Sequence, residues 1–144
     1  MKAAATRAIV LDASVVVAWC FEDESTSFSE GVLDLLSAGM EVLTPAIWPF
    51  EVANALLMAE RRKRIKMAQV TALLARIAGL RISVEPIQTS SAFNQILSIA
   101  RQNNLTEYDA AYVELALREG LPLATLDAGL RTAARHLGIA LVST

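Results

Sequence analysis

Short runs of apolar residues alternate along this chain with longer segments in which apolar residues recur every three or four positions. The short runs predict β-strands, and the longer segments predict amphipathic α-helices. Strands separated by helices indicate crossover connections, so we expect an α/β fold with a mostly parallel sheet flanked by helices on both faces. The predicted strands are residues 9–11, 42–43, 82–84, 123–126 and 140–142. The predicted helices lie near residues 15–20, 25–38, 47–62, 66–79, 88–103, 107–119 and 127–137.

Two of the predicted strands run directly into an aspartate. One apolar segment ends at Asp12, and another ends at Asp127. Because the ligands of open parallel sheets gather at the carboxyl ends of the strands, both acids should lie at that edge. The simpler role for either residue is that of a helix N-cap, whose side chain accepts hydrogen bonds from the first free backbone amides. For either aspartate taken alone, the sequence favours the N-cap.

Two further acids occupy helix faces that are otherwise small or apolar. Asp109 shares the face of Tyr112 in one predicted helix, whereas Glu107 belongs to the polar face of the same helix. The helix dipole favours an acid in the first turn, which accounts for the turn of Asp109 but not for its face. Glu51 lies in the first turn of another helix, also among small and apolar residues. Buried carboxylates are costly unless they are paired or bind a metal, so both positions suggest a site.

The composition describes a folded domain without a general nucleic-acid footprint. Of the 144 residues, 54% are hydrophobic and 19% are charged, which excludes disorder and suits one domain over residues 1–144. The formal net charge of −2 provides no basic surface of the usual nucleic-acid-binding kind. His136 and Cys20 are the only residues of their types, so catalytic sets based on histidine or cysteine are not credible. No apolar run reaches the roughly 20 residues of a membrane span, and we expect a cytoplasmic protein.

The acids have no evident cationic partner in the sequence. Basic residues cluster at 61–66, beyond the end of a predicted helix, and none adjoins Asp12, Asp109 or Asp127. If these acids and Glu51 converge, something must offset their mutual repulsion. A hard divalent cation with oxygen ligands, Mg²⁺ or Mn²⁺, is the natural candidate.

Four segments together carry a resemblance to a known family. They read IVLDASVVVAW at 9–19, FEVANAL at 50–56, LTEYDAAYVELA at 105–116 and LATLD at 123–127. In this order, with an acid in each, they resemble the PIN-domain ribonucleases, and among these most closely the VapC-type toxins of toxin–antitoxin pairs. The likeness covers nearly the whole chain.

The resemblance implies a small PIN-like α/β domain, usually dimeric, with metal-dependent endonuclease activity on RNA and a partner antitoxin that inhibits it. It also assigns a four-acid site and several small polar neighbours. The matching acids are Asp12, Glu51, Asp109 and Asp127, and the matching neighbours are Ser14, Asn54 and Thr125.

The expected chemistry is hydrolysis by a metal-activated water. We expect Asp12 and Asp109 to contact the metal most directly. Asp127 would complete the shell or bind a second ion, and Glu51 would ligate the metal or position the water. Another Mg²⁺-dependent phosphohydrolase, a PIN nuclease of RNA processing and a non-enzymatic module with capping acids remain as alternatives.

Two further features have two interpretations each. The basic run at 61–66 is either a solvated helix end or a rim that contacts RNA phosphates. Four aromatic residues could stack RNA bases, although packing or contacts with the antitoxin are favoured. These residues are Trp19, Phe21, Trp48 and Phe50.

Overall fold

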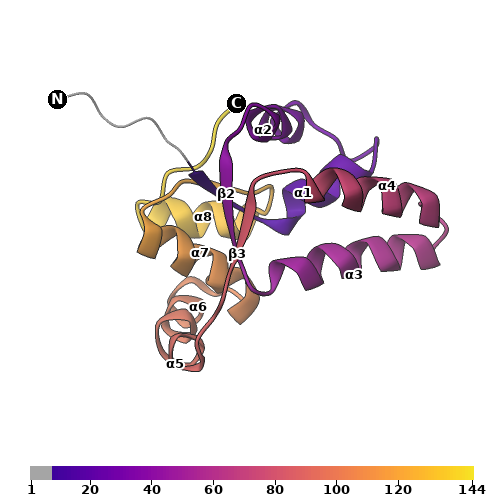
Figure 1. The fold of residues 1–144 in the computed structure, drawn as a ribbon. Helices are drawn as coiled ribbons and strands as arrows, with labels where there is room; N and C mark the ends of the chain where they lie inside the picture. The colour runs from indigo at the N-terminus through magenta and orange to yellow at the C-terminus, as the bar shows by residue number, and fades with distance from the viewer. Residues whose placement is uncertain (1–7) are drawn as a thin grey trace.

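The computed structural model of this chain describes residues 8–144, in which strands and helices alternate (Figure 1). The strands are β1 (Ala8–Leu11), β2 (Glu41–Pro45), β3 (Ile82–Glu85) and β4 (Leu123–Ala124). The helices are α1 (Ala13–Cys20), α2 (Ser27–Ser37), α3 (Trp48–Arg61), α4 (Met67–Ala78), α5 (Thr89–Ser91), α6 (Leu97–Asn103), α7 (Glu107–Glu119) and α8 (Ala128–His136). A π-helical turn, η1 (Ala92–Ile96), joins α5 directly to α6.

The strands form one sheet in the order β3-β2-β1-β4, and each neighbouring pair is parallel. Val10 of β1 pairs with Leu43 of β2 on one side and with Leu123 of β4 on the other. The chain therefore proceeds outward from β1 to β3 and then returns to add β4 beside β1. Ligands of open α/β sheets bind beyond the carboxyl ends of the strands where the strand order reverses in this way. The loops after β1 and β4 are thus the first place to look for a site.

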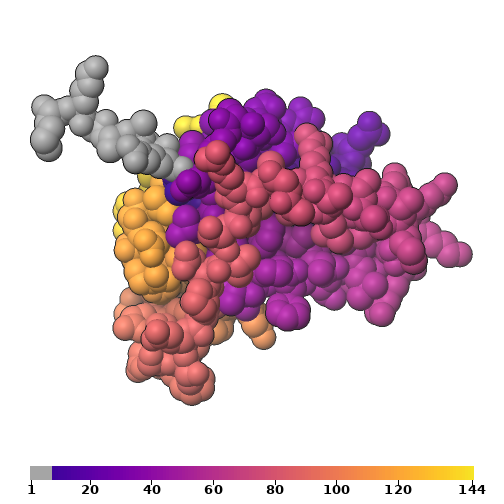
Figure 2. Space-filling view, viewed as in Figure 1, coloured from indigo at the N-terminus to yellow at the C-terminus, as the bar shows by residue number. Residues whose placement is uncertain are grey.

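Helices cover both faces of the sheet. In Figure 1, α7 and α8 lie on one side of the sheet, and α1 and α3 lie on the other. β1 is buried along its whole length, as expected for a central parallel strand, and it packs with residues of these helices in the main core. Figure 2 shows that α3 and α4 form a lobe that extends away from the sheet, on the opposite side from α5 and α6. The predicted α/β class and its parallel sheet are confirmed.

The structure corrects three predicted elements. β4 ends at Ala124 rather than at residue 126, because the side chain of Thr125 bonds to Asp12 and the chain then turns into α8. The predicted strand at 140–142 is reduced to one parallel bridge between Leu123 and Leu141. The predicted helix at 88–103 is continuous but irregular, because η1 interrupts its α-helical hydrogen bonding.

Residues 1–7, which the predicted domain included, lie outside the described residues. None of the helices in residues 8–144 combines the length and the apolar character that a membrane crossing requires.

Candidate active site

Asp12 lies directly after β1, at the carboxyl edge of the sheet, and only 4% of its surface is exposed. It occupies the N-cap position of α1, but its side chain makes no capping hydrogen bond. Instead, Ser14 Oγ and Thr125 Oγ1 donate to Asp12 Oδ2 over 2.6 Å and 2.8 Å. Among residues 8–144, no hydrogen bond reaches Asp12 Oδ1. One oxygen therefore orients the carboxylate, and the other is available to a ligand.

Asp127 follows β4 at the same edge, and it does cap a helix. Its Oδ2 accepts a hydrogen bond from the backbone amide of Leu130 at 2.8 Å, in the first turn of α8. Its own backbone amide donates to Thr125 Oγ1 at 3.0 Å. The N-cap interpretation is therefore right for one oxygen of Asp127, and it is wrong for Asp12.

Glu51 and Asp109 project from the first turns of α3 and α7. The start of α7 is fixed by Thr106, whose Oγ1 accepts a hydrogen bond from the backbone amide of Asp109 at 3.1 Å. Glu51 Oε1 accepts a hydrogen bond from the hydroxyl of Tyr112 at 2.6 Å. Both acids are partly buried, as their helix faces predicted.

The four carboxylates lie close enough to act on one another electrostatically. Burial raises the pKa of Asp12, and the charge of Asp127 raises it further. The pKa of Glu51 is raised by burial and then by the charges of Asp12 and Asp109. The pKa of Asp109 is raised by burial and then by the charges of Asp127 and Asp12. The fold thus brings all four predicted acids into one cluster.

No ion pair among the described residues neutralises any of these acids. Arg131, which the sequence reasoning did not consider, lies one turn after Asp127 but supports the loop instead. Its Nη1 donates to the backbone carbonyl of Thr125 at 2.9 Å, and its guanidinium lies 5.8 Å from the centre of the Phe28 ring. No cation within residues 8–144 therefore relieves the repulsion among the carboxylates through an ion pair.

The donor set fits a hard divalent cation in its chemistry. Carboxylate oxygens are the ligands that Mg²⁺ and Mn²⁺ prefer, and a cation would relieve the repulsion that contributes to the raised pKa values. The side chains are nevertheless not arranged as finished ligands: in residues 8–144, no three acidic, histidine or cysteine side chains are placed to hold one ion. Glu51 and Asp127 each use one oxygen in a protein hydrogen bond. They would bind an ion through the second oxygen or after a side-chain rotation.

The predicted polar neighbours of the acids differ in their contacts. Ser14 and Thr125 both bond to Asp12, and the backbone amide of Leu126 donates to Ser14 Oγ at 3.0 Å. Asn54 is exposed on α3, and its side chain makes no hydrogen bond to a described residue. The structure therefore connects the two hydroxyl residues to the cluster but does not connect Asn54.

Tyr112 contacts a candidate site residue, although its sequence pattern indicates only a core position. It lies on the face of Asp109, and its hydroxyl donates to Glu51. The available signal was physical: a tyrosine on a buried helix face needs a partner for its hydroxyl, but only the packing of α3 against α7 identifies that partner as Glu51. The structure also corrects the placement of Glu107 on the polar, solvated face of its helix. Both of its carboxylate oxygens are shielded from solvent and lack a partner among residues 8–144.

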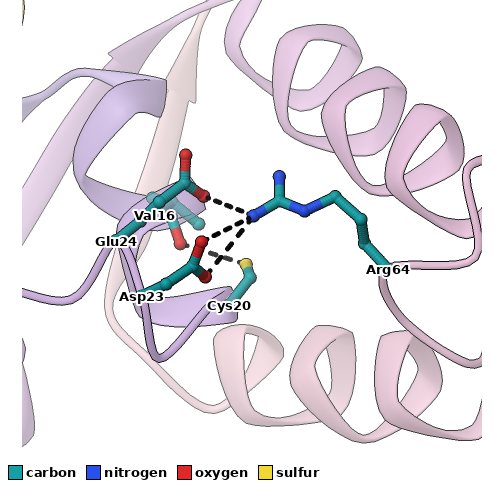
Figure 3. Close-up of polar contacts among 5 residues, drawn as sticks. All are labelled: Val16, Cys20, Asp23, Glu24 and Arg64. Carbon is teal, nitrogen blue, oxygen red and sulfur yellow. Dashed lines mark hydrogen bonds and ion pairs between the residues drawn. The ribbon is translucent and has the colours of Figure 1, made fainter.

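The structure divides the basic run at 61–66 into two parts. Arg64 Nη2 lies 3.3 Å from a carboxylate oxygen of Asp23 and 3.6 Å from one of Glu24 (Figure 3). Its guanidinium also lies 4.2 Å from the centre of the Phe21 ring. Arg64 therefore ties the turn between α3 and α4 to the loop after α1. The other basic residues of the run are exposed and form no ion pair with a described residue.

The four aromatic residues that were candidates for packing or stacking differ in their exposure to solvent. Phe21 and Trp48 are buried, and Trp19 is partly buried. Phe50 is 79% exposed, immediately before Glu51 on α3. Packing therefore accounts for the first three, and only Phe50 presents its ring to solvent beside the acids.

Comparisons with known proteins agree with this fold. The PIN domain family model matches residues 9–136. Ribonuclease VapC3 of Pyrobaculum aerophilum is 28% identical over 119 residues, which cover 83% of this chain and 88% of that protein. Among solved structures, PAE2754 from Pyrobaculum aerophilum has a TM-score of 0.68 at 22% identity, covering 92% of this chain and 87% of that one.

Two further structures share the fold at lower similarity. VapBC2 from Rickettsia felis, bound to a DNA fragment from their promoter, has a TM-score of 0.58 at 14% identity, with 94% of this chain and 97% of that chain covered. FitAcB from Neisseria gonorrhoeae has a TM-score of 0.53 at 19% identity, with coverages of 94% and 96%.

Proposed function

The chain belongs to the PIN-domain family, and from this premise we propose that it is a Mg²⁺-dependent endoribonuclease, the toxin of a type II toxin–antitoxin pair. Its similarity to ribonuclease VapC3 over most of both chains supports the proposed activity. The observation that carries the proposal is the cluster of four carboxylates, which has no ion-paired cation within the described residues and is located where the strand order of the sheet reverses. Mn²⁺ would be accepted by the same oxygen ligands.

The four acids of the site would have different roles in binding the metal and its water. A divalent cation supplies a water of lowered pKa and positive charge beside the scissile phosphate. Asp12 and Asp109 would hold the ion most directly, the former through the oxygen that has no hydrogen bond. Asp127 would contribute its second oxygen or bind a second ion. Glu51 would ligate the ion or orient the attacking water.

The hydroxyl groups of Ser14 and Thr125 position Asp12 rather than reacting themselves. Because both donate to Oδ2, they restrict rotation of the carboxylate and keep Oδ1 free. Loss of such an outer contact typically lowers metal affinity or activity by about 10- to 100-fold. We include Asn54 in the substrate-facing rim because it is exposed on the helix that carries Glu51.

Purified protein incubated with total RNA tests this function directly. We expect cuts at defined internal positions in the presence of Mg²⁺ and no cuts in EDTA, with the new ends mapped by sequencing. Cleavage that persists in EDTA would contradict the role of the metal. Release of phosphate from a small phosphomonoester without RNA cleavage would favour the phosphohydrolase alternative.

We also propose that the protein acts in the cytoplasm as a homodimer and that an antitoxin protein inhibits it. A toxin requires a neutralising partner, so the neighbouring gene upstream should encode a small DNA-binding antitoxin. Expression of this chain alone should arrest growth, and co-expression of the neighbouring gene should restore it. A PIN nuclease of RNA processing would instead be tolerated without a partner.

Neutralising the exposed part of the basic run should weaken RNA binding. The variant Arg61→Gln, Arg62→Gln, Lys63→Gln removes three charges, so the slope of log affinity against log salt should become shallower by about 2 for single-stranded RNA. The affinity is measured with a fluorescent RNA in the presence of EDTA, at several salt concentrations. No change in the slope would show that these residues form a solvated helix end and do not contact RNA phosphates.

The matched control for this experiment is Arg64→Gln. Because Arg64 is engaged with Asp23, Glu24 and Phe21, its loss should lower the free energy of unfolding by up to about 1 kcal/mol. The slope for RNA binding should then stay close to that of the wild-type protein.

A further inference from the structure

The hydroxyl of Tyr112 contacts one acid of the cluster, although its ring belongs to the core. The residue is completely buried on α7, and its hydroxyl donates to Glu51 Oε1 on α3 across a distance of 2.6 Å. The two residues are 61 positions apart in the sequence. Because the ring is held by core packing, the hydroxyl is a fixed point from which Glu51 can be oriented.

The same hydroxyl also lies within electrostatic reach of Asp12. Asp109 lies one turn before Tyr112 on the same helix. Tyr112 is therefore bonded to one of the four acids, Glu51, and shares its helix with a second, Asp109.

Glu51 needs such a restraint. The charges of Asp12 and Asp109 repel its carboxylate, which is the end group of a flexible side chain. Without a donor on Oε1, the repulsion would favour rotamers that turn the carboxylate toward solvent. A tyrosine hydroxyl carries its proton at neutral pH, so it is a donor to the carboxylate.

We propose that Tyr112 is a positioning residue of the acidic site, which holds Glu51 through Oε1 in the orientation needed for a divalent cation or its water. The inference rests on the proposed metal-dependent function, and it extends that function to a residue that is not itself a metal ligand. Tyr112 acts entirely through Glu51, and this dependence makes the inference testable.

The test measures the affinity for Mn²⁺ alone, by electron paramagnetic resonance or calorimetry, in four proteins: wild type, Tyr112→Phe, Glu51→Gln and the double variant. Loss of an outer contact of a metal site typically weakens metal binding 10- to 100-fold, so we expect Tyr112→Phe to weaken Mn²⁺ binding by at least about tenfold. In the Glu51→Gln background the same substitution should change the affinity by less than about twofold, because the group it positions is already altered.

Tyr108→Phe is the matched control, because Tyr108 lies on the same helix with 62% of its surface exposed. It should bind Mn²⁺ as the wild type does. Circular dichroism and thermal melting in EDTA check that every variant is folded, and a folded Glu51→Ala, Tyr112→Phe pair replaces the Gln background if that variant is unstable.

Three outcomes overturn the inference. Unchanged Mn²⁺ affinity in Tyr112→Phe, or an equal loss in both backgrounds, would show that the hydroxyl does not act through Glu51 while leaving the metal-dependent function intact. A wild-type protein that binds no Mn²⁺ would refute the proposed metal site itself and the role of Tyr112 with it.

Discussion

Asp12→Asn should reduce Mg²⁺-dependent RNA cleavage by at least about 100-fold while the protein stays folded. Loss of an outer contact of a metal site already lowers metal affinity or activity by about 10- to 100-fold, and we expect Asp12 to contact the ion itself. Asparagine keeps the shape of the side chain and one oxygen that can accept from Ser14 and Thr125. It removes the negative charge, so the oxygen left for the ion is replaced by an amide nitrogen that cannot bind it.

The measurement is the initial rate of cleavage of a defined RNA at saturating Mg²⁺. Asp34→Asn is the matched control, because Asp34 is exposed on α2 and touches none of the four acids through a hydrogen bond or ion pair within residues 8–144. Its cleavage rate should equal that of the wild type. Cleavage by Asp12→Asn at a rate within threefold of the wild type would remove Asp12 from the catalytic site.

Asp109→Asn should make the metal-free protein more stable and should reduce the stabilisation that Mg²⁺ provides. At neutral pH the wild-type protein holds mutually repelling carboxylates together, and neutralising one of them relieves this cost. We expect a gain of about 1 kcal/mol in EDTA, or about 3 °C in melting temperature. In Mg²⁺ at 100 times its dissociation constant the wild type should gain about 2.7 kcal/mol, which the variant should largely lack. The order of stability should therefore reverse when Mg²⁺ is added.

The pH dependence of this difference follows from the raised pKa values. In the folded protein Asp12, Glu51 and Asp109 titrate above their ordinary values of 3.8, 4.5 and 3.8, so the folded state binds protons more tightly than the unfolded state. The contribution of these groups to stability is greatest below the ordinary values and is lost as the pH rises through the raised ones. The advantage of Asp109→Asn in EDTA should thus be full near pH 7 and should vanish below about pH 4.

Thermal melting of both proteins from pH 3.5 to 8, with and without Mg²⁺, provides these values. Glu22→Gln serves as the control for the removal of one negative charge, because Glu22 is exposed in the loop between α1 and α2. It should shift the melting temperature little, and equally with and without Mg²⁺. A wild-type protein more stable than Asp109→Asn in EDTA at pH 7 would show that the repulsion is not the dominant effect.

The sequence by itself determined the order of most elements and the four acids that we propose for the site. Apolar periodicity distinguishes buried strands from amphipathic helices, so the α/β class and the parallel sheet follow from local pattern. The placement of Asp12 and Asp127 after strands follows from the same pattern, because parallel strands end at one edge. The faces of Glu51 and Asp109 follow from helical geometry.

Only the tertiary structure decided which atoms meet. Thr125 bonds to Asp12 across 113 positions, and Arg64 pairs with Asp23 across 41. Periodicity places a side chain on a face but does not say what lies opposite that face. For that reason the sequence could not separate the capping role of Asp127 from the orienting contacts of Asp12.

The limits of local pattern are clearest at residues 140–142 and at Tyr112. Residues 140–142 have the apolar character of a strand, but whether a strand forms depends on the neighbour available, and here only one bridge to Leu123 is made. Tyr112 had the pattern of a core residue, and its ring is one. Its hydroxyl reaches Glu51 only because α3 and α7 pack so that the two side chains lie within 2.6 Å. A hydrogen bond depends on positions accurate to tenths of an ångström, and the packing of distant segments alone sets such positions.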